Sequence, residues 1–304
     1  MCPILHFNNL NKPIMKKLLL SIMCVACSFG YKSVASEPIA GEENPKFNCE
    51  NIVFADAVVK ATCVSAFDTN GDGELSYEEA AKVTSIPSHF FGENKREVST
   101  FNELQYFTNL QVIKDEAFDS SNLSQIIIPE SVIHIGYKAF SRTEIVSIVI
   151  PDSVKTIGAL AFSTCWYLEN IVLSKNITSI ADCAFEYTNI QYVTIPEGIT
   201  SIGEGAFSYC DRLVEVTIPC SVTAIGIRAF FNCEGLKIIY CKPTTPPTLD
   251  KMNSMNYNLN NGYGRLGRMK KYFKIYVPKE SVSAYKKDRN WKHYSKCIEG
   301  YDFK

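Results

Sequence analysis

A run of acidic, amide and hydroxyl residues carries the clearest chemistry in the sequence of 304 residues. Residues 68–79 read DTNGDGELSYEE, so oxygen-bearing side chains recur at alternate positions. Calcium binds about six to eight hard oxygen ligands, and a loop that folds back on itself gathers them from a short stretch. The sequence predicts a Ca²⁺ site formed by Asp68, Asn70, Asp72, the backbone carbonyl of Glu74, Ser76 through water, and Glu79 with both carboxylate oxygens.

Two short helices are expected to hold this loop. The preceding helix has one small and apolar face, made by Ile52, Ala55, Val59, Cys63 and Ala66. Gly73 permits the sharp turn, and Ser76 can cap a helix over Tyr77–Val83 with Glu79 three residues later. The pattern indicates an α-helical EF-hand-type module over residues 37–84, with a structural ion. The alternative is a solvated acidic turn, where Asn-Gly and Asp-Gly pairs are common.

A repeat occupies most of the remaining sequence. Leu213, Val216 and Ile218 follow the L-x-x-L-x-L strand pattern, and Pro219 ends that strand because it has no N–H to donate. The sequence predicts a leucine-rich-repeat solenoid over residues 110–242, with one strand and a short helical or irregular return in each turn of 22–23 residues. The Ala-Phe pair marks six successive turns, at Ala117-Phe118, Ala139-Phe140, Ala161-Phe162, Ala184-Phe185, Ala206-Phe207 and Ala229-Phe230.

The segments beside the repeat lack its pattern, as expected of solenoid caps. Residues 85–109 are predicted to form the N-terminal cap, against which Leu75 can pack because no second calcium loop follows. Residues 243–272 are rich in Pro, Asn and Gly and predict a mobile loop. Residues 273–304 predict a C-terminal cap, with a last strand, a helix over Glu280–Lys287, and Trp291 and Tyr294 sealing the final turn.

Three of the twelve cysteines occupy equivalent bends of the repeat. Cys165, Cys210 and Cys233 each lie three residues after the repeated Phe, where shorter turns carry Ser or Thr. A buried thiol behaves as a small hydrophobic group, which suits such a bend. The alternative is a disulfide between Cys210 and Cys233 on adjacent turns.

The N-terminal 36 residues have the pattern of an export signal. Lys16 and Lys17 precede a short apolar run, Val34 and Ser36 suit a cleavage site, and Met15 is then the expected start. Lipidation at Cys27, giving an outer-membrane lipoprotein, is a second route to the cell surface. An apolar N-terminal helix of a cytosolic protein is the alternative to export. The net charge of −1 gives no electrostatic case for nucleic acid.

The repeated Ile-Pro-x-Ser-Val-x-x-Ile-Gly-x-x-Ala-Phe rhythm resembles the BspA-type leucine-rich-repeat surface proteins of bacteria. The resemblance covers Leu110–Tyr240 and the closing segment with Val277-Pro278, Tyr285 and Trp291. It implies export and adhesive or host-protein binding, but no particular ligand. One departure, Leu173-Ser174 in place of Ile-Pro, is expected to bend the sheet locally.

A protein-binding role without catalysis is therefore expected. Motifs such as GxSxG and HExxH are absent from the sequence, and His134 occupies a slot held elsewhere in the repeat by Thr, Ser or Ala. We expect a monomer outside the cell, with no transmembrane helix in the mature chain, that binds an extracellular protein; a glycan-binding accessory for nutrient capture is the alternative. The outward strand positions predicted to bind the partner are Ile127, Val149, Val172, Tyr192, Thr194, Thr217 and Tyr240. The alternative is that β-propensity alone selects Val, Ile, Thr and Tyr at these positions.

Overall fold

The structure is a computed structural model that describes residues 51–249 and 273–303. These residues belong to one compact unit, Cys49–Lys304. The export signal predicted over residues 1–36, including Cys27, lies outside the described residues, as does the part of the predicted mobile loop from residue 250 onward. Among the described residues, no helix is both long enough and apolar enough to cross a membrane.

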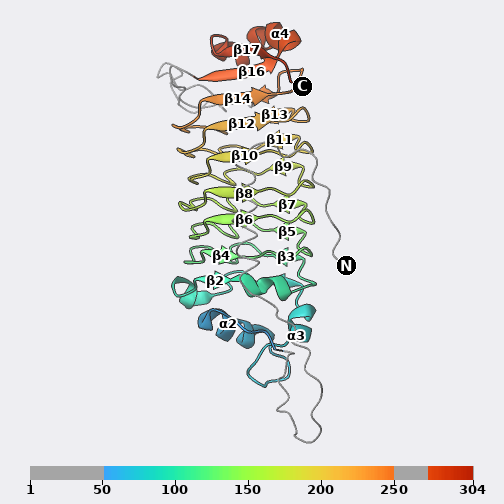
Figure 1. The fold of residues 1–304 in the computed structure, drawn as a ribbon, viewed down its shortest axis with the longest axis vertical. Helices are drawn as coiled ribbons and strands as arrows, with labels where there is room; N and C mark the ends of the chain where they lie inside the picture. Colours follow the sequence, from blue (N-terminus) through green and yellow to red (C-terminus); the bar gives the residue numbers. More distant parts are fainter. Residues whose placement is uncertain (1–50, 250–272, 304) are drawn as a thin grey trace, which may run out of the picture. The chain divides into compact units, whose positions relative to one another are not determined.

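One stack of strands follows the L-x-x-L-x-L segments (Figure 1). The strands within the repeat alternate buried and outward residues, as Ser147–Val149 does with only its central Ile148 buried. The strands of this first stack are β2 Thr100–Phe101, β4 Gln125–Ile126, β6 Ser147–Val149, β8 Asn170–Val172, β10 Tyr192–Thr194, β12 Glu215–Ile218, β14 Ile238–Cys241, β16 Lys274–Pro278 and β17 Ile298–Tyr301.

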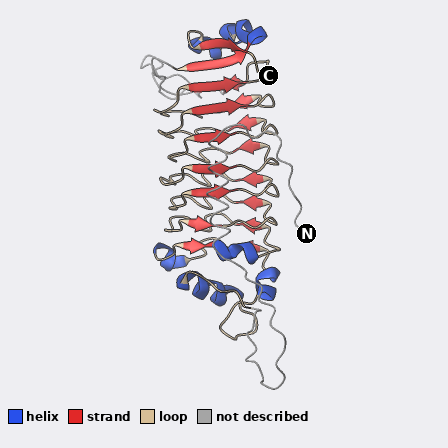
Figure 2. Cartoon of the chain, in the orientation of Figure 1, coloured by secondary structure: helices blue, strands red, loops and turns tan. Residues whose placement is uncertain are grey.

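A second stack of short strands runs along the return side of the coils (Figure 2). The sequence predicted a helical or irregular return, but each return contains a strand of two residues, because its apolar residue pairs with the equivalent residue of the next coil. The strands of this second stack are β1 Ser85–Ile86, β3 Val112–Ile113, β5 His134–Ile135, β7 Thr156–Ile157, β9 Ser179–Ile180, β11 Ser201–Ile202, β13 Ala224–Ile225 and β15 Thr248–Leu249.

Parallel pairing holds successive coils in register. In the first stack, for example, Val193 pairs with Val216 and Val216 with Ile239. In the first stack, hydrogen bonding is continuous from β10 to β17 but breaks between β4 and β6 and between β8 and β10, and the second stack breaks between β7 and β9. The β8/β10 and β7/β9 breaks flank the coil with Leu173-Ser174, where the departure from Ile-Pro predicts a local bend. There the Ser174 hydroxyl donates to the Val154 carbonyl at 2.7 Å.

A ladder of phenylalanines fills the space between the two stacks. Neighbouring rings have centroids 5.1–5.6 Å apart, and each ring is at most 2% exposed. A single coil cannot exclude water from such a ring, whereas stacked coils can, which explains why the Ala-Phe pair must recur in every turn. The members are Phe118, Phe140, Phe162, Phe185, Phe207 and Phe230.

The bends after these rings hold the three predicted thiols. Thr143 donates its hydroxyl to the Phe140 carbonyl at 2.9 Å, and Cys165 of the next coil donates its thiol to the same carbonyl at 3.0 Å. Cys210 and Cys233 make equivalent bonds to the preceding coil and are free thiols, in agreement with the structural interpretation. Burial raises the pKa of Cys165 to about 11, so this thiol stays protonated and unreactive at neutral pH.

Short helices cover both ends of the stacks (Figure 1). The N-terminal end has α2 Ala57–Phe67, α3 Tyr77–Lys82 and the 3₁₀ turns η1 Gly92–Arg96 and η2 Asn102–Tyr106. The C-terminal end has η4 Lys279–Ser281, α4 Val282–Lys287 and η5 Trp291–Tyr294. Trp291 is fully buried there and donates its indole N–H to the Pro247 carbonyl at 2.7 Å, so it closes the last turn as the sequence indicates.

Candidate functional site

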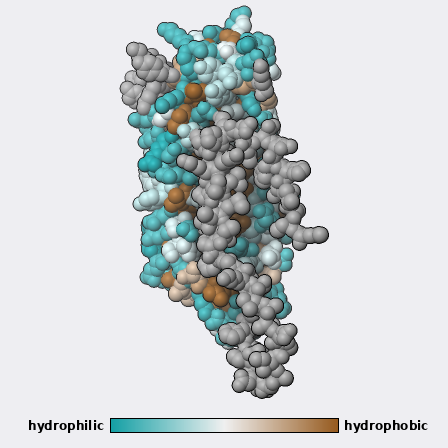
Figure 3. All heavy atoms as spheres, in the orientation of Figure 1, coloured by the Kyte–Doolittle hydropathy of each residue, from teal (hydrophilic) through white to brown (hydrophobic). Residues whose placement is uncertain are grey.

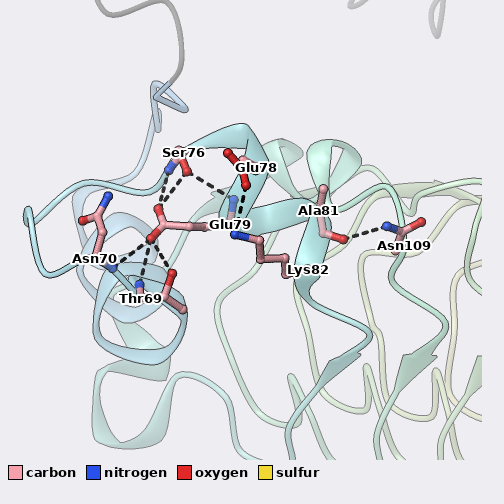
Figure 4. Close-up of polar contacts among 8 residues, drawn as sticks. All are labelled: Thr69, Asn70, Ser76, Glu78, Glu79, Ala81, Lys82 and Asn109. Atoms are coloured by element: carbon pink, nitrogen blue, oxygen red, sulfur yellow. Dashed lines mark hydrogen bonds and ion pairs between the residues drawn. The ribbon is translucent and has the colours of Figure 1, made fainter.

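The loop at residues 68–79 lies between α2 and α3, as the sequence predicts. Asp56 caps α2 by accepting hydrogen bonds from the Val58 and Val59 N–H groups at 2.9 and 3.2 Å. Ser76 caps α3, and it forms a reciprocal capping box with Glu79 (Figure 4). Both helices are short, with 11 and 6 residues, so their caps matter for their stability.

Asp68 organises the interior of the loop. One of its carboxylate oxygens accepts from the N–H groups of Asn70 and Gly71 at 3.1 and 2.7 Å, and the other accepts from Gly73 at 3.0 Å. Gly71 and Gly73 adopt φ values of 75° and 80°, a region that is costly for residues with a Cβ. The two glycines therefore let the backbone curl around the Asp68 carboxylate.

Glu79 closes the loop from the other side (Figure 4). One carboxylate oxygen accepts from the Thr69 N–H at 2.8 Å and its hydroxyl at 2.9 Å, and the other accepts from the Ser76 N–H at 3.0 Å and its hydroxyl at 2.8 Å. The side chain is buried, at 4% exposed. The hydrogen bond from the Ser76 backbone, followed by that from Thr69, lowers the pKa of Glu79 to about 2, so the carboxylate is charged at neutral pH.

The carboxylate, amide and hydroxyl oxygens of this loop are of the type that binds a hard cation. Its carboxylates, however, are not arranged around a common metal position. Among the described residues, no group of three His, Cys, Asp or Glu side chains is arranged to hold a metal. Asp68, Asp72 and Glu79 are committed to N–H groups of the loop instead. The Glu74 carboxylate pairs with Lys60 at 2.6 Å, which leaves its backbone carbonyl as the expected ligand.

The helices flanking the loop are bonded to the first coil. The second Asp56 oxygen accepts from the Ser99 N–H and hydroxyl at 2.7 and 2.9 Å. Burial raises the pKa of Asp56, but these bonds and those of the helix cap outweigh it, so the pKa lies below its usual value. The Phe67 ring packs against Phe90 and Phe107 at centroid distances of 5.6 and 5.8 Å. Changes in the loop can therefore reach the N-terminal end of the coils.

The backbone of Leu75 pairs with the segment at residues 51–52, a contact that the sequence did not predict. Its carbonyl accepts from the Ile52 N–H at 2.8 Å, and Asn51 forms an antiparallel bridge with Ser76. The Leu75 side chain is fully buried. The chain's own segment at residues 51–52 thus supplies the short pairing that a second loop would otherwise provide.

The predicted partner-binding residues lie on the outer face of the first stack. Parallel register places Val149 beside Val172, and Thr194 beside Thr217, which is followed by Tyr240. Tyr192 lies in the neighbouring column, level with Glu215. Ile127, Val149, Val172 and Tyr192 are exposed, at 40–47%, and Thr194 is exposed as well, whereas Thr217 and Tyr240 are half-buried.

An aromatic cluster continues this face and was missed in the sequence. The Tyr240 ring stacks on Tyr276 at 5.4 Å and meets Tyr301 at 5.3 Å, and Phe303 packs against Tyr301 at 5.0 Å. The sequence does indicate that Tyr276 faces outward, because it is the central residue of its strand and lies between two buried residues. Residues 243–272 interrupt the repeat, so the pairing of Tyr240 with Tyr276 could not be counted from the period.

Two of the described histidines, His89 and His134, make local polar contacts. His89 pairs with Glu116 at 3.2 Å beside a cavity of about 180 Å³, which no hydroxyl or thiol side chain lines. His134 lies 2.6 Å from the Thr156 hydroxyl on the second stack. Most of the visible described surface is hydrophilic, with separate hydrophobic patches (Figure 3). Among the described residues, the loop and the sheet face therefore remain the candidate sites.

The fold is a parallel-stranded repeat solenoid, and comparison with known proteins gives its family. The model of the BspA type leucine-rich repeat region matches residues 48–145, 84–213 and 133–254. These matches span more than half of the sequence, and the chain belongs to this family.

Solved structures with similarity include a leucine-rich repeat protein from T. pallidum, 28% identical with a TM-score of 0.40 over 44% of this chain and 64% of that one. The chain thus spans less than two thirds of that protein. Another, from Bacteroides ovatus, is 19% identical with a TM-score of 0.27 over 77% and 72%. A leucine-rich cell surface protein from Faecalibacterium prausnitzii is 20% identical with a TM-score of 0.24 over 49% and 58%. No curated protein matches the chain.

Proposed function

We propose that this chain is an exported, surface-exposed binding protein whose first strand stack binds an extracellular protein. Family membership supports a repeat scaffold, and solenoids use extended faces of stacked strands for recognition. Export would depend on the signal at residues 1–36 or on lipidation of Cys27, both outside the described residues.

The observation that carries this proposal is the uncharged outward column and its aromatic end. Val149 and Val172 lie side by side at 42% and 40% exposed, and no charged residue stands in their column as far as Tyr240. Three tyrosines gather at the C-terminal end, and tyrosine is enriched among residues that dominate binding energy. A flat, weakly apolar face with clustered aromatic anchors suits a protein surface better than a small molecule.

Charges on this column test the proposal. Val149→Glu combined with Val172→Glu should abolish binding of the full chain to an array of immobilised extracellular matrix and serum proteins, at unchanged melting temperature. Ile133→Glu is the matched control, because Ile133 is equally exposed at 40% but precedes the second stack. Binding that survives both glutamates but is lost on deletion of residues 251–268 would assign recognition to that segment instead.

The second part of the proposal is a structural calcium ion in the loop. The ligands would be Asp68, Asn70, Asp72, the Glu74 carbonyl and Glu79, with Ser76 acting through water. Glu79 would exchange its hydrogen bonds from Thr69 and Ser76 for the ion. Because Asp56 and Phe67 join this region to the first coil, the ion would stabilise the N-terminal end of the repeat.

A further inference from the structure

A second aromatic group lies away from the sheet face, along the bends that precede the first-stack strands. The Trp166 ring meets Tyr187 at 5.2 Å, Tyr187 stacks on Tyr209 at 4.3 Å with 9° between the planes, and Tyr209 meets Phe231 at 5.4 Å. Each ring comes from a different coil, so the group extends over four coils. We call Trp166, Tyr167, Tyr187, Tyr209 and Phe231 the bend ladder.

The repeat itself shows that the fold does not need Trp166 and Tyr167. The bends that match in length carry Asp211-Arg212 and Glu234-Gly235 at the same positions. Trp166 and Tyr167 are 53% and 57% exposed, more than any other aromatic side chain of the described residues. Two large rings left in water at a bend that accepts Asp-Arg indicate selection for a contact outside the chain.

The backbone under the ladder supports the same conclusion. Every coil has a left-handed residue two positions after the repeated Phe, and Asn232 fills that place in one of them. Tyr187 and Tyr209 adopt φ values of 56° and 58° there, although a bulky side chain is poorly suited to that region. The Tyr187 ring stacks on Tyr209 and contacts the Trp166 ring on its other side, and Asn189 donates to the main-chain carbonyl of Trp166, so both the ring and the backbone of Trp166 have fixed neighbours. Such preorganisation lowers the entropic cost of binding.

The surroundings of the ladder select among ligand classes. Rings with centroids 4.3–5.4 Å apart touch one another, which leaves no cage for a quaternary ammonium group. Glu186, Asp211 and Glu234 lie on the same bends and offset Arg212 and Arg228, so the ladder has no excess of positive charge to attract an anionic membrane. The polar side chains near the ladder include planar groups that place hydrogen-bond donors next to acceptors. Arg212 and Glu169, which form an ion pair at 2.9 Å, are an example.

We propose that the bend ladder is a binding site for a neutral oligosaccharide. A pyranose ring has an apolar C–H face, which can lie on the tilted indole of Trp166 and on Tyr167, and a rim of hydroxyls, which need paired donors and acceptors. Glu169, Asn189 and Arg212 supply such groups in the coils that carry the rings. The site is separate from the protein-binding face of the first stack, and it would let one scaffold hold a glycan and a protein together.

Quenching of tryptophan fluorescence in the full chain reports on this site. The sequence has two tryptophans, and Trp291 is fully buried, so an added quencher reaches mainly Trp166. Soluble xyloglucan, mixed-linkage β-glucan, galactomannan and the neutral oligosaccharides released from mucin serve as separate probes. At least one should shield Trp166 from acrylamide quenching by twofold or more. The polysaccharide that does so should also retard the protein in affinity electrophoresis.

The decisive variant is Trp166→Asp combined with Tyr167→Arg, which installs the pair that the fold accepts at residues 211–212. The double variant should keep the melting temperature of the wild type, and its retardation by the polysaccharide should fall at least tenfold. Tyr137→Ala is the control and should change neither, because Tyr137 is an exposed tyrosine, at 39%, outside both proposed sites. The proposal is overturned if no probe retards the wild type, or if retardation survives in the double variant. It is equally overturned if the double variant loses only the protein binding that depends on Val149 and Val172, since the ladder would then belong to the protein-binding face.

Discussion

At the scale of single residues, Glu79 is the side chain on which the loop depends. Its two oxygens receive hydrogen bonds from Thr69 and Ser76, so the free loop is held closed by the group that would bind calcium. A cation must therefore interact with this carboxylate more favourably than the N–H and hydroxyl groups that it would replace. This competition is consistent with weak binding, with a Kd on the order of 10⁻⁴–10⁻³ M, as in extracellular modules of this type.

Millimolar calcium should raise the melting temperature of the full chain. At 10 mM the gain corresponds to about 1–3 kcal/mol for such an affinity. Asp68→Ala and Glu79→Ala should remove the gain, and differential scanning calorimetry measures it. Glu78→Ala is the control, because this neighbour is 83% exposed and pairs only with Lys82 in the same helix. A wild type insensitive to calcium, or a variant at Asp68 that keeps the full gain, would exclude the site.

The charge of Glu79 also makes the loop sensitive to acid. Its pKa falls from a usual 4.5 to about 2 in the folded chain, so the unfolded chain takes up the proton first as the pH drops. The stability from this carboxylate is therefore complete above pH 4.5 and is lost as the pH falls towards 2. Glu79→Gln should flatten the dependence of unfolding free energy on pH in this window, measured by urea titration without calcium. An unchanged slope would show that Glu79 does not carry the effect.

The residues that form this loop could be predicted from the sequence, whereas the contacts that their side chains make could not. Alternating Asp68, Asn70 and Asp72 with Gly73 identify the loop because each position has a chemical requirement. The reach of Glu79 back to Thr69, and the pairing of residues 51–52 with Leu75, depend on tertiary packing that no spacing reveals.

At the scale of elements, each coil is stabilised by a phenylalanine between two strands. Phe162→Ala should destabilise the chain by about 3–5 kcal/mol, because a fully buried ring is lost and its neighbours at 5.1 and 5.6 Å lose their stacking. Chemical denaturation followed by circular dichroism measures the change. Trp166→Ala, in the same coil but half exposed, should cost less than about 1 kcal/mol. Equal losses for the two variants would contradict the assigned core.

The first-stack strands were predictable because a period of two with a terminal proline is visible over several residues, as at Val216–Pro219. The second-stack strands have two residues each, too few to show alternation, and their pairing exists only between coils. Strand β16 could be predicted as a strand. Its register with Tyr240 could not, because residues 243–272 interrupt the regular spacing of the repeat.

At the scale of the whole molecule, stacking converts short local patterns into long continuous surfaces. The outward residues of β6 to β17 form one face that no single coil could present, and the bends form a second. The two proposed surfaces would let such a chain change its ligands without changing its core. The partner-binding face is the central assignment, because the family alone fixes the scaffold and not the ligand.

Hydroxyl-radical footprinting of the full chain, free and bound to a protein captured on the array, tests this assignment most directly. Bound partner should protect Tyr192 and Tyr301 on the sheet face, which are 47% and 42% exposed, and should leave Tyr167 on the bends fully reactive. Protection of Tyr167 with unchanged labelling of Tyr192 and Tyr301 would contradict the account.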